Sequence, residues 1–160
     1  MKAIFAGTFD PLTNGHLGLI LRASEIVDEL VVLVADNQLK TTTFTVVERI
    51  EMIKNVIGNN KKIKIDYTNG LVVEYAKKIG AKIMFRGLRN FQDYEYELSL
   101  SKYNKNIEKS VETVLLFPSD NAEFISSSGI KELVYYGVDI TKYVPKENVD
   151  IIVDRIKKVI

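Results

Sequence analysis

The chain has 160 residues, a formal net charge of +1, 46% hydrophobic residues and 27% charged residues. These values are ordinary for a soluble globular domain, and the near-neutral charge argues against a nucleic-acid partner. The absence of cysteine excludes disulfides, a thiol nucleophile and a thiolate metal site. No apolar run approaches the length of a membrane span and no export signal begins the chain, so we expect no membrane association and a cytoplasmic location.

The spacing of hydrophobic residues alternates between that of a strand and that of a helix. In chain order it predicts a strand at Lys2–Ala6, a helix at Asn14–Val27, a strand at Leu30–Ala35, a helix at Val46–Ile57, a strand at Ile63–Tyr67, a helix at Leu71–Ile79, a strand at Ala81–Phe85, a helix at Phe91–Ile107, a strand at Glu112–Phe117, and helices at Ser128–Tyr136 and Glu147–Val159. The alternation predicts a single Rossmann-like, doubly wound α/β domain over residues 1–160, with a five-stranded parallel sheet.

Three residues mark predicted helix ends. Gly58 and Gly80 follow helical segments and are interpreted as their terminators. Pro145 is expected in the first turn of the last helix, where a missing N–H is tolerated.

The turn between the first strand and the first helix is the most informative segment. It contains Thr8 and the run Thr13-Asn14-Gly15-His16, whose histidine is the only one in the chain. A helix start offers unpaired N–H groups and a positive dipole end, and the adjacent glycine lets a phosphate approach the backbone. A lone histidine is more often a capping or partly buried residue. This one follows the carboxyl end of a strand, where open α/β sheets bind ligands.

Polar loops also follow other predicted strands. Lys40 lies after the second strand, Arg86 and Arg89 lie after the fourth, and Ser126-Ser127-Ser128 lies after the fifth. Taken singly, these are a surface lysine, a solvated arginine pair and a helix cap. Because a parallel sheet brings such loops to one edge, we expect them to converge on a crevice that binds phosphate groups. We find neither a catalytic carboxylate pair nor a cluster with metal-ligand spacing.

The predicted helix at Phe91–Ile107 carries apolar residues on more than one side. One helical spacing contains Phe91, Tyr94 and Leu98, and another contains Tyr96, Leu100, Tyr103 and Ile107. We expect one set to pack on the sheet and the other to contact a neighbouring subunit, which predicts a homo-oligomer.

Several motifs carry a family resemblance. Gly7-Thr8-Phe9-Asp10-Pro11 followed by Thr13-Asn14-Gly15-His16 resembles the signature of the nucleotidylyltransferase superfamily with the (His/Thr)-x-Gly-His motif. Three further segments resemble those of bacterial phosphopantetheine adenylyltransferases: Arg86-Gly87-Leu88-Arg89, Asp93-Tyr94-Glu95-Tyr96-Glu97 and Phe124-Ile125-Ser126-Ser127-Ser128. The similarity runs from Met1 to about Tyr143. The combination of these motifs is highly specific.

The resemblance implies adenylyl transfer from ATP to 4′-phosphopantetheine, giving dephospho-coenzyme A and pyrophosphate in coenzyme A biosynthesis. It also implies Mg²⁺ bound mainly through the ATP phosphates, a hexameric assembly, and coenzyme A as a feedback ligand. Two alternatives stay open. The chain is a sister nucleotidylyltransferase acting on another phosphorylated substrate, or it is a non-catalytic nucleotide or coenzyme A sensor on the same fold.

Matched motif by motif, the resemblance implies catalytic roles for His16, Lys40 and Arg89, with no metal ligand from the protein. It implies ATP contacts from Thr8, Phe9, His16, Gly87, Leu88, Arg89, Glu97, Ala122, Glu123, Phe124, Ile125, Ser126, Ser127 and Ser128. It implies phosphopantetheine contacts from Thr8, Lys40, Val72 and Arg86. Family members often carry an aromatic residue where this chain has Ala122, so contacts there are expected from the backbone.

The implied reaction agrees with the residues present. The attacking phosphate oxygen is already ionised at neutral pH, so no general base is needed, and the protein positions the reactants and stabilises charge. His16 would donate a hydrogen bond to the α-phosphate. Its charge state stays open, because a helix start disfavours the imidazolium and nearby phosphates favour it.

Overall fold

The computed structural model describes residues 1–119 and 125–159. In this part of the chain five strands form one all-parallel sheet in the order β3-β2-β1-β4-β5. The strands are β1 (Lys2–Gly7), β2 (Glu29–Ala35), β3 (Ile63–Thr68), β4 (Ile83–Gly87) and β5 (Glu112–Leu116). The chain builds outward from β1 to β3 and then returns to the other side of β1. The strand order therefore reverses between β1 and β4, and sheets of this kind bind ligands at the carboxyl side of that point.

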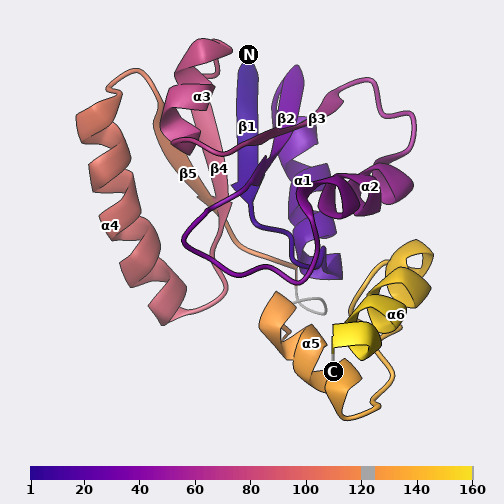
Figure 1. Cartoon of the computed structure of the whole chain (residues 1–160). Coiled ribbons are helices and arrows are strands. Elements are labelled where there is room, and N and C mark those ends of the chain that lie inside the picture. The colour runs from indigo at the N-terminus through magenta and orange to yellow at the C-terminus, as the bar shows by residue number, and fades with distance from the viewer. Residues whose placement is uncertain (120–124, 160) are drawn as a thin grey trace.

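Helices cover both faces of the sheet (Figure 1). On one face, α1 (Asn14–Ile26) and α2 (Val46–Ile57) bury a core with alternate side chains of the central strands. On the other face, α3 (Val72–Lys78) packs Val73 and Ala76 against Ile4 and Leu33. This arrangement confirms the predicted doubly wound α/β fold.

A third core forms beyond the carboxyl ends of the strands, where α5 (Ser127–Tyr135) and α6 (Val149–Val159) lie together in Figure 1. A 3₁₀ turn at Lys146–Asn148 precedes α6. Ile130 of α5 and Ile152 of α6 pack with Met52 of α2 and with Phe44, all of them fully buried. This packing brings the start of α5 to the edge of the sheet that carries the polar loops. None of the described helices is long and apolar enough to span a membrane.

Predicted and observed element bounds agree to within two residues throughout. Gly58 ends α2 with a φ of 58° and Gly80 follows α3 with a φ of 72°, so both predicted terminators are confirmed. The fourth strand is shifted by two residues, because the Ala81 N–H donates to the Ala76 carbonyl and closes the turn after α3. At its other end, Arg86 and Gly87 continue the pairing with β5.

The expectation for Pro145 is wrong. Its backbone is extended, with φ −55° and ψ 135°, and it precedes the 3₁₀ turn as the N-cap residue. Its carbonyl accepts from the Asn148 N–H at 2.9 Å, and the α-helix begins only at Val149. A short 3₁₀ turn can satisfy backbone groups before a helix start.

The expectation for α4 (Phe91–Ile107) is also wrong in one respect. Neither apolar set is buried against the sheet. Six of the seven side chains are exposed, from 39% for Leu98 to 72% for Phe91, and Leu100 is partly buried and lines a cavity. The buried residue of α4 is Glu97, which pairs with Arg86 of β4. In Figure 1 α4 runs along the outside of the α3 face. This helix is therefore joined to the sheet by a charge pair and leaves most of its apolar side chains uncovered.

Candidate active site

Two cavities lie at the carboxyl edge of the sheet. The first, of about 280 Å³, is lined by the β1–α1 turn, the end of β4 and the start of α5, and includes His16, Arg89 and Ser127. The second, of about 600 Å³, is lined by the loop after β2, the start of α3 and one side of α4. Four residues line both cavities: Gly7, Thr8, Arg86 and Tyr96. Two ligands bound in the two cavities would therefore meet at this shared wall.

His16 is held by a reciprocal helix cap at the start of α1. The Thr13 hydroxyl accepts from the His16 N–H at 3.2 Å, and the imidazole Nδ1 accepts from the Thr13 N–H at 3.2 Å. An Nδ1 that accepts a backbone N–H carries no proton, so the neutral ring carries its proton on Nε2. The Phe9 ring meets the imidazole edge-on, with ring centroids 5.3 Å apart. His16 thus both caps α1 and lines the first cavity.

The ring of His16 is electrically neutral near pH 7. Burial, followed by the positive charges of Arg89 and Arg86, lowers its pKa from 6.5 to about 4. The question left open by the sequence is therefore answered for the ligand-free chain. A neutral imidazole with a proton on Nε2 is a hydrogen-bond donor at this edge of the sheet.

This lowered pKa predicts a pH-dependent stability. Between about pH 6.5 and pH 4 the unfolded chain binds a proton at His16 that the folded chain excludes. The stability that the neutral ring contributes is complete above pH 6.5 and is lost as the pH falls through 4. We expect the free energy of unfolding, from urea titrations at pH 7 and pH 5, to fall further in the wild type than in His16→Gln. Identical pH dependence in both proteins would contradict the neutral ring.

The turn after β1 is shaped by one close approach. A Cβ on Gly7 would lie 2.8 Å from the Phe9 ring, so any larger residue there would displace the ring. Phe9 itself has a φ of 52°, in the left-handed region, and is 2% exposed. Phe9 lines the first cavity, and its ring packs directly against Gly7 in this turn.

Arg86 is anchored at the wall between the two cavities. Its guanidinium donates to the Glu97 carboxylate through Nε at 2.9 Å and Nη2 at 2.7 Å, and through Nη1 to the Ala6 carbonyl at 2.8 Å. The Glu97 side chain is only 7% exposed. The structure thus places Glu97, predicted on the ATP side, in the first cavity as the partner of Arg86.

The neighbouring residues of the Arg-Gly-Leu-Arg motif differ in position. Arg89 lines the first cavity and pairs with Asp93 through Nε at 3.0 Å. Gly87 also lines it, and a Cβ there would lie 2.7 Å from the Leu19 side chain of α1. Leu88 donates its N–H to the Leu116 carbonyl at 2.9 Å and is absent from the described residues that line either cavity.

The predicted phosphopantetheine residues gather at the second cavity. Lys40 and Val72 line it, together with Thr8 and Arg86. Lys40 is exposed, and its N–H donates to the Asn37 carbonyl at 2.9 Å in a tight turn after β2. These four residues come from four separate segments that only the sheet topology brings together.

The serine-rich segment divides between capping and lining. Ser126 caps α5 by accepting from the Gly129 N–H at 3.0 Å, and Ser127 donates to the Pro11 carbonyl at 2.8 Å. Ile125 and Ser127 line the first cavity, whereas Ser126 and Ser128 are not among its described lining residues. The predicted contacts Ala122, Glu123 and Phe124 lie outside the described residues.

Sequence reasoning missed two buried charged residues beside the site. Arg49 is 1% exposed and Asp10 is 5% exposed. The signal for Arg49 was present, since it lies three and four positions before the buried Met52 and Ile53, on the apolar side of α2. A charged residue on the apolar side of a helix indicates a buried side chain that is held by hydrogen bonds or an ion pair.

Comparisons with known proteins place this geometry in a class. The family model described as cytidylyltransferase-like matches residues 4–133. A putative nicotinate-nucleotide adenylyltransferase from Vibrio parahaemolyticus superposes with a TM-score of 0.70, covering 94% of this chain and 97% of that one, at 15% identity. That likeness shows the fold. Sheet, cavities and family model together define a nucleotidylyltransferase.

Curated relatives narrow the class. The phosphopantetheine adenylyltransferase of Lachnoclostridium phytofermentans is 41% identical over 95% of this chain and 93% of its own length. That of Thermotoga neapolitana is 40% identical over 99% of this chain and 98% of its own length. That of Nautilia profundicola is 40% identical over 91% of this chain and 95% of its own length. The chain belongs to the phosphopantetheine adenylyltransferase family.

Proposed function

We propose that the chain transfers the adenylyl group of ATP to the phosphate of 4′-phosphopantetheine, giving dephospho-coenzyme A and pyrophosphate in coenzyme A biosynthesis. The observation that carries the proposal is the pair of cavities that share Thr8 and Arg86. ATP occupies the first cavity and phosphopantetheine the second. The family membership names the two substrates.

The reaction is a displacement at the α-phosphorus of ATP. A phosphate oxygen of phosphopantetheine forms a bond to that phosphorus, the bond to the bridging oxygen of the β-phosphate breaks, and pyrophosphate leaves with the electron pair. Charge grows on the α-phosphate oxygens as five groups surround the phosphorus. A neutral imidazole with its proton on Nε2 donates to one of these oxygens without competing as a base.

The remaining charge is shared among cations from three segments. Lys40 neutralises the incoming phosphate of phosphopantetheine, and Arg89 neutralises the ATP phosphates. Arg86 lies at the shared wall of the two cavities, between the two substrates. The acidic residues of the first cavity, Asp93 and Glu97, are already paired with arginines. Mg²⁺ would therefore be held by the ATP phosphates and water rather than by these carboxylates, and it would supply neutralisation of the pyrophosphate charge.

A coupled assay of pyrophosphate release tests the proposal. We expect release that requires both ATP and 4′-phosphopantetheine, with nicotinate mononucleotide as the control acceptor. Release with nicotinate mononucleotide and none with phosphopantetheine would identify a sister enzyme. Binding of both ligands with no release would identify a sensor.

The two cavities predict separate effects for two cations. Lys40→Ala weakens phosphopantetheine binding by roughly tenfold to hundredfold and leaves ATP binding nearly unchanged, because a lost charge-assisted hydrogen bond typically costs about 1.5–3 kcal/mol. Arg89→Ala does the reverse. Arg86 was assigned to phosphopantetheine alone from the sequence, and from its place in both linings we expect Arg86→Ala to affect both ligands. Calorimetry of each ligand with each variant measures this, and equal losses for both ligands in the Lys40 and Arg89 variants would contradict it.

We further propose a closed, symmetric homo-oligomer, with a hexamer as the specific expectation, that responds to coenzyme A by feedback and works in the cytoplasm. The uncovered apolar side chains of α4 support an interface between subunits.

The oligomer is tested on that helix. Replacing both Tyr94 and Leu98 with glutamate should lower the mass of the oligomer measured by light scattering. The circular dichroism spectrum should remain that of a folded protein, since both side chains are exposed in the subunit. Gln92→Glu adds a charge at an exposed polar position of the same helix and should leave the mass unchanged. A wild-type monomer at micromolar concentration would overturn the proposal.

A further inference from the structure

We propose that Arg49 and Asp10 are positioning residues that hold the loop carrying Lys40 against the turn carrying Thr8. Neither residue is among the described lining of the two cavities, so each acts through others. The inference rests on the proposed function and deepens it, because it assigns the geometry of the phosphopantetheine side to two buried charges.

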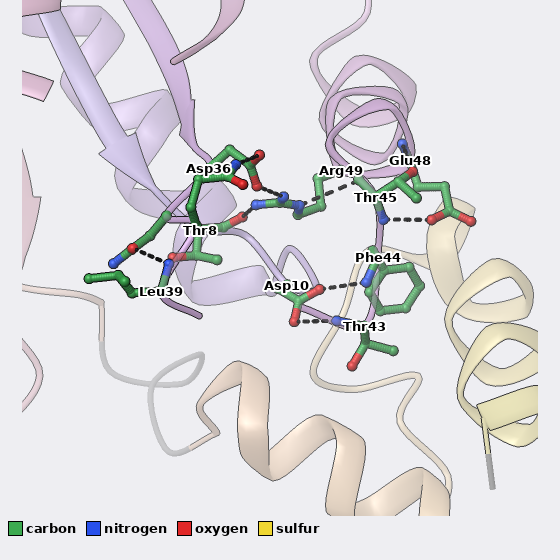
Figure 2. Close-up of polar contacts among 11 residues, drawn as sticks. Thr8, Asp10, Asp36, Leu39, Thr43, Phe44, Thr45, Glu48 and Arg49 are labelled. Carbon is green, nitrogen blue, oxygen red and sulfur yellow. Dashed lines mark hydrogen bonds and ion pairs between the residues drawn. The ribbon is translucent and has the colours of Figure 1, made fainter. Parts of the chain in front are cut away.

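Arg49 joins three segments from inside the protein (Figure 2). Its Nη1 donates to the Thr8 carbonyl at 3.1 Å and its Nη2 to Asp36 Oδ1 at 2.7 Å. Its Nε donates to the Thr45 carbonyl at 3.4 Å, at the start of its own helix. An arginine that is 1% exposed is tolerated only with such partners, since an unpaired buried charge is strongly destabilising. Arg49 therefore ties the turn after β1 to the first residue of the loop after β2.

Asp10 secures the other end of the same loop. Its Oδ1 accepts from the Phe44 N–H at 2.8 Å and its Oδ2 from the Thr43 N–H at 3.0 Å, and Lys131 of α5 pairs with it. Figure 2 shows the carboxylate directed at these two backbone groups. Phe44 is fully buried, so this end of the loop is fixed by packing as well.

The Lys40 loop is consequently bound at both ends to one turn. Asp36 is held to Thr8 through Arg49, and Thr43 and Phe44 are held to Asp10, two residues further along the β1–α1 turn. Ordering a loop before its ligand arrives removes a conformational-entropy cost from binding. Lys40 lies between the two anchors, so its distance from Thr8 is set before phosphopantetheine binds.

A positioning role differs from mere support of the fold in what it changes. Loss of an anchor lets the loop of Lys40 shift, which affects the ligand of the second cavity. ATP lies in the first cavity, which the loop does not line in the described residues. A general loss of structure would instead weaken both ligands together.

The test uses Arg49→Lys and Asp10→Asn in the full-length chain. Lysine keeps a positive charge but lacks the fork that reaches Thr8 and Asp36 at once, and asparagine turns one acceptor of Asp10 into a donor. We expect the KM for 4′-phosphopantetheine to rise about tenfold or more in each, with the Kd for ATP by calorimetry changed less than about threefold. Lys54→Met, an exposed charge on the same helix, is the matched control and should change neither value.

A double variant gives a second readout. In a chain that already carries Lys40→Ala, a shift of the loop no longer displaces the lysine that contacts the ligand. Arg49→Lys should therefore raise the KM for 4′-phosphopantetheine much less in that background than in the wild type. Additive effects, or equal losses for both ligands, would overturn the inference with the proposed function intact. A wild-type chain that releases no pyrophosphate would overturn both. If Arg49→Lys fails to fold, Asp10→Asn alone decides the outcome.

Discussion

Replacing His16 with glutamine lowers kcat by about 10²–10³ and changes the Kd for ATP by less than about threefold. The neutral imidazole of the native chain donates from Nε2 to the α-phosphate, and that donation strengthens as charge develops in the transition state. Glutamine is the suitable replacement because a glutamine at the third helical position supports a capping box. Its amide oxygen can keep the bond to the Thr13 N–H, while its amide NH₂ group donates from a different position and direction than the imidazole Nε2.

Steady-state kinetics with both substrates and calorimetry with ATP measure the two quantities. His16→Ala removes both the donor and the imidazole half of the reciprocal cap, while the Thr13 hydroxyl can still accept from the backbone N–H of residue 16. It should lose a comparable amount of kcat and, in addition, about 1 kcal/mol of stability from the hydrogen bond lost at the Thr13 N–H. An alanine variant that keeps more than about a third of the wild-type kcat would exclude the transition-state role on this scale.

Replacing Arg86 with methionine lowers the free energy of unfolding by about 3–5 kcal/mol. The Glu97 carboxylate is 7% exposed and receives its hydrogen bonds from Arg86, so the single variant leaves a buried charge without its partner. The double variant with Glu97→Met should recover most of the lost stability, because two apolar side chains of similar size can replace a buried ion pair.

Activity separates the two roles of Arg86. The double variant should regain stability in urea denaturation but remain far less active than the wild type, since the cation at the shared wall of the cavities is still missing. A single Arg86→Met variant within about 1 kcal/mol of the wild type would show that Glu97 finds other partners. Full activity in the double variant would show that Arg86 has no role in the reaction.

The local features of the site could be read from neighbouring residues. The helix start at Thr13-Asn14-Gly15-His16, the strand before it and the helix ends at Gly58 and Gly80 all depend on spacing, capping and turn chemistry within a few positions. The expectation that cations meet at one sheet edge also followed, because a parallel sheet leaves no other place for the loops after its strands.

Partners across the fold could not be read in this way. Arg86 and Glu97 were each interpreted as a ligand contact, and it is the placement of α4 beside β4 that makes them partners. Arg49 reaches Thr8 across 41 positions of sequence, and Asp10 reaches Phe44 across 34. Such pairs depend on where whole elements pack, which no short-range pattern encodes.

The chain's residues alone were thus enough to indicate the order of strands and helices and the turn that we propose to bind phosphate, because each of these depends on short-range spacing and chemically distinctive side chains. The class of reaction was indicated by the resemblance of several motifs to a known family. Packing settled the rest. It divided the crevice into two cavities, put the proton of the neutral His16 ring on Nε2, committed Glu97 to Arg86, and left most of the apolar side chains of α4 uncovered. The physical reason is that burial and hydrogen-bond pairing are properties of surfaces brought together by the fold, and the same side chain is a ligand, a cap or a structural partner according to what it meets there.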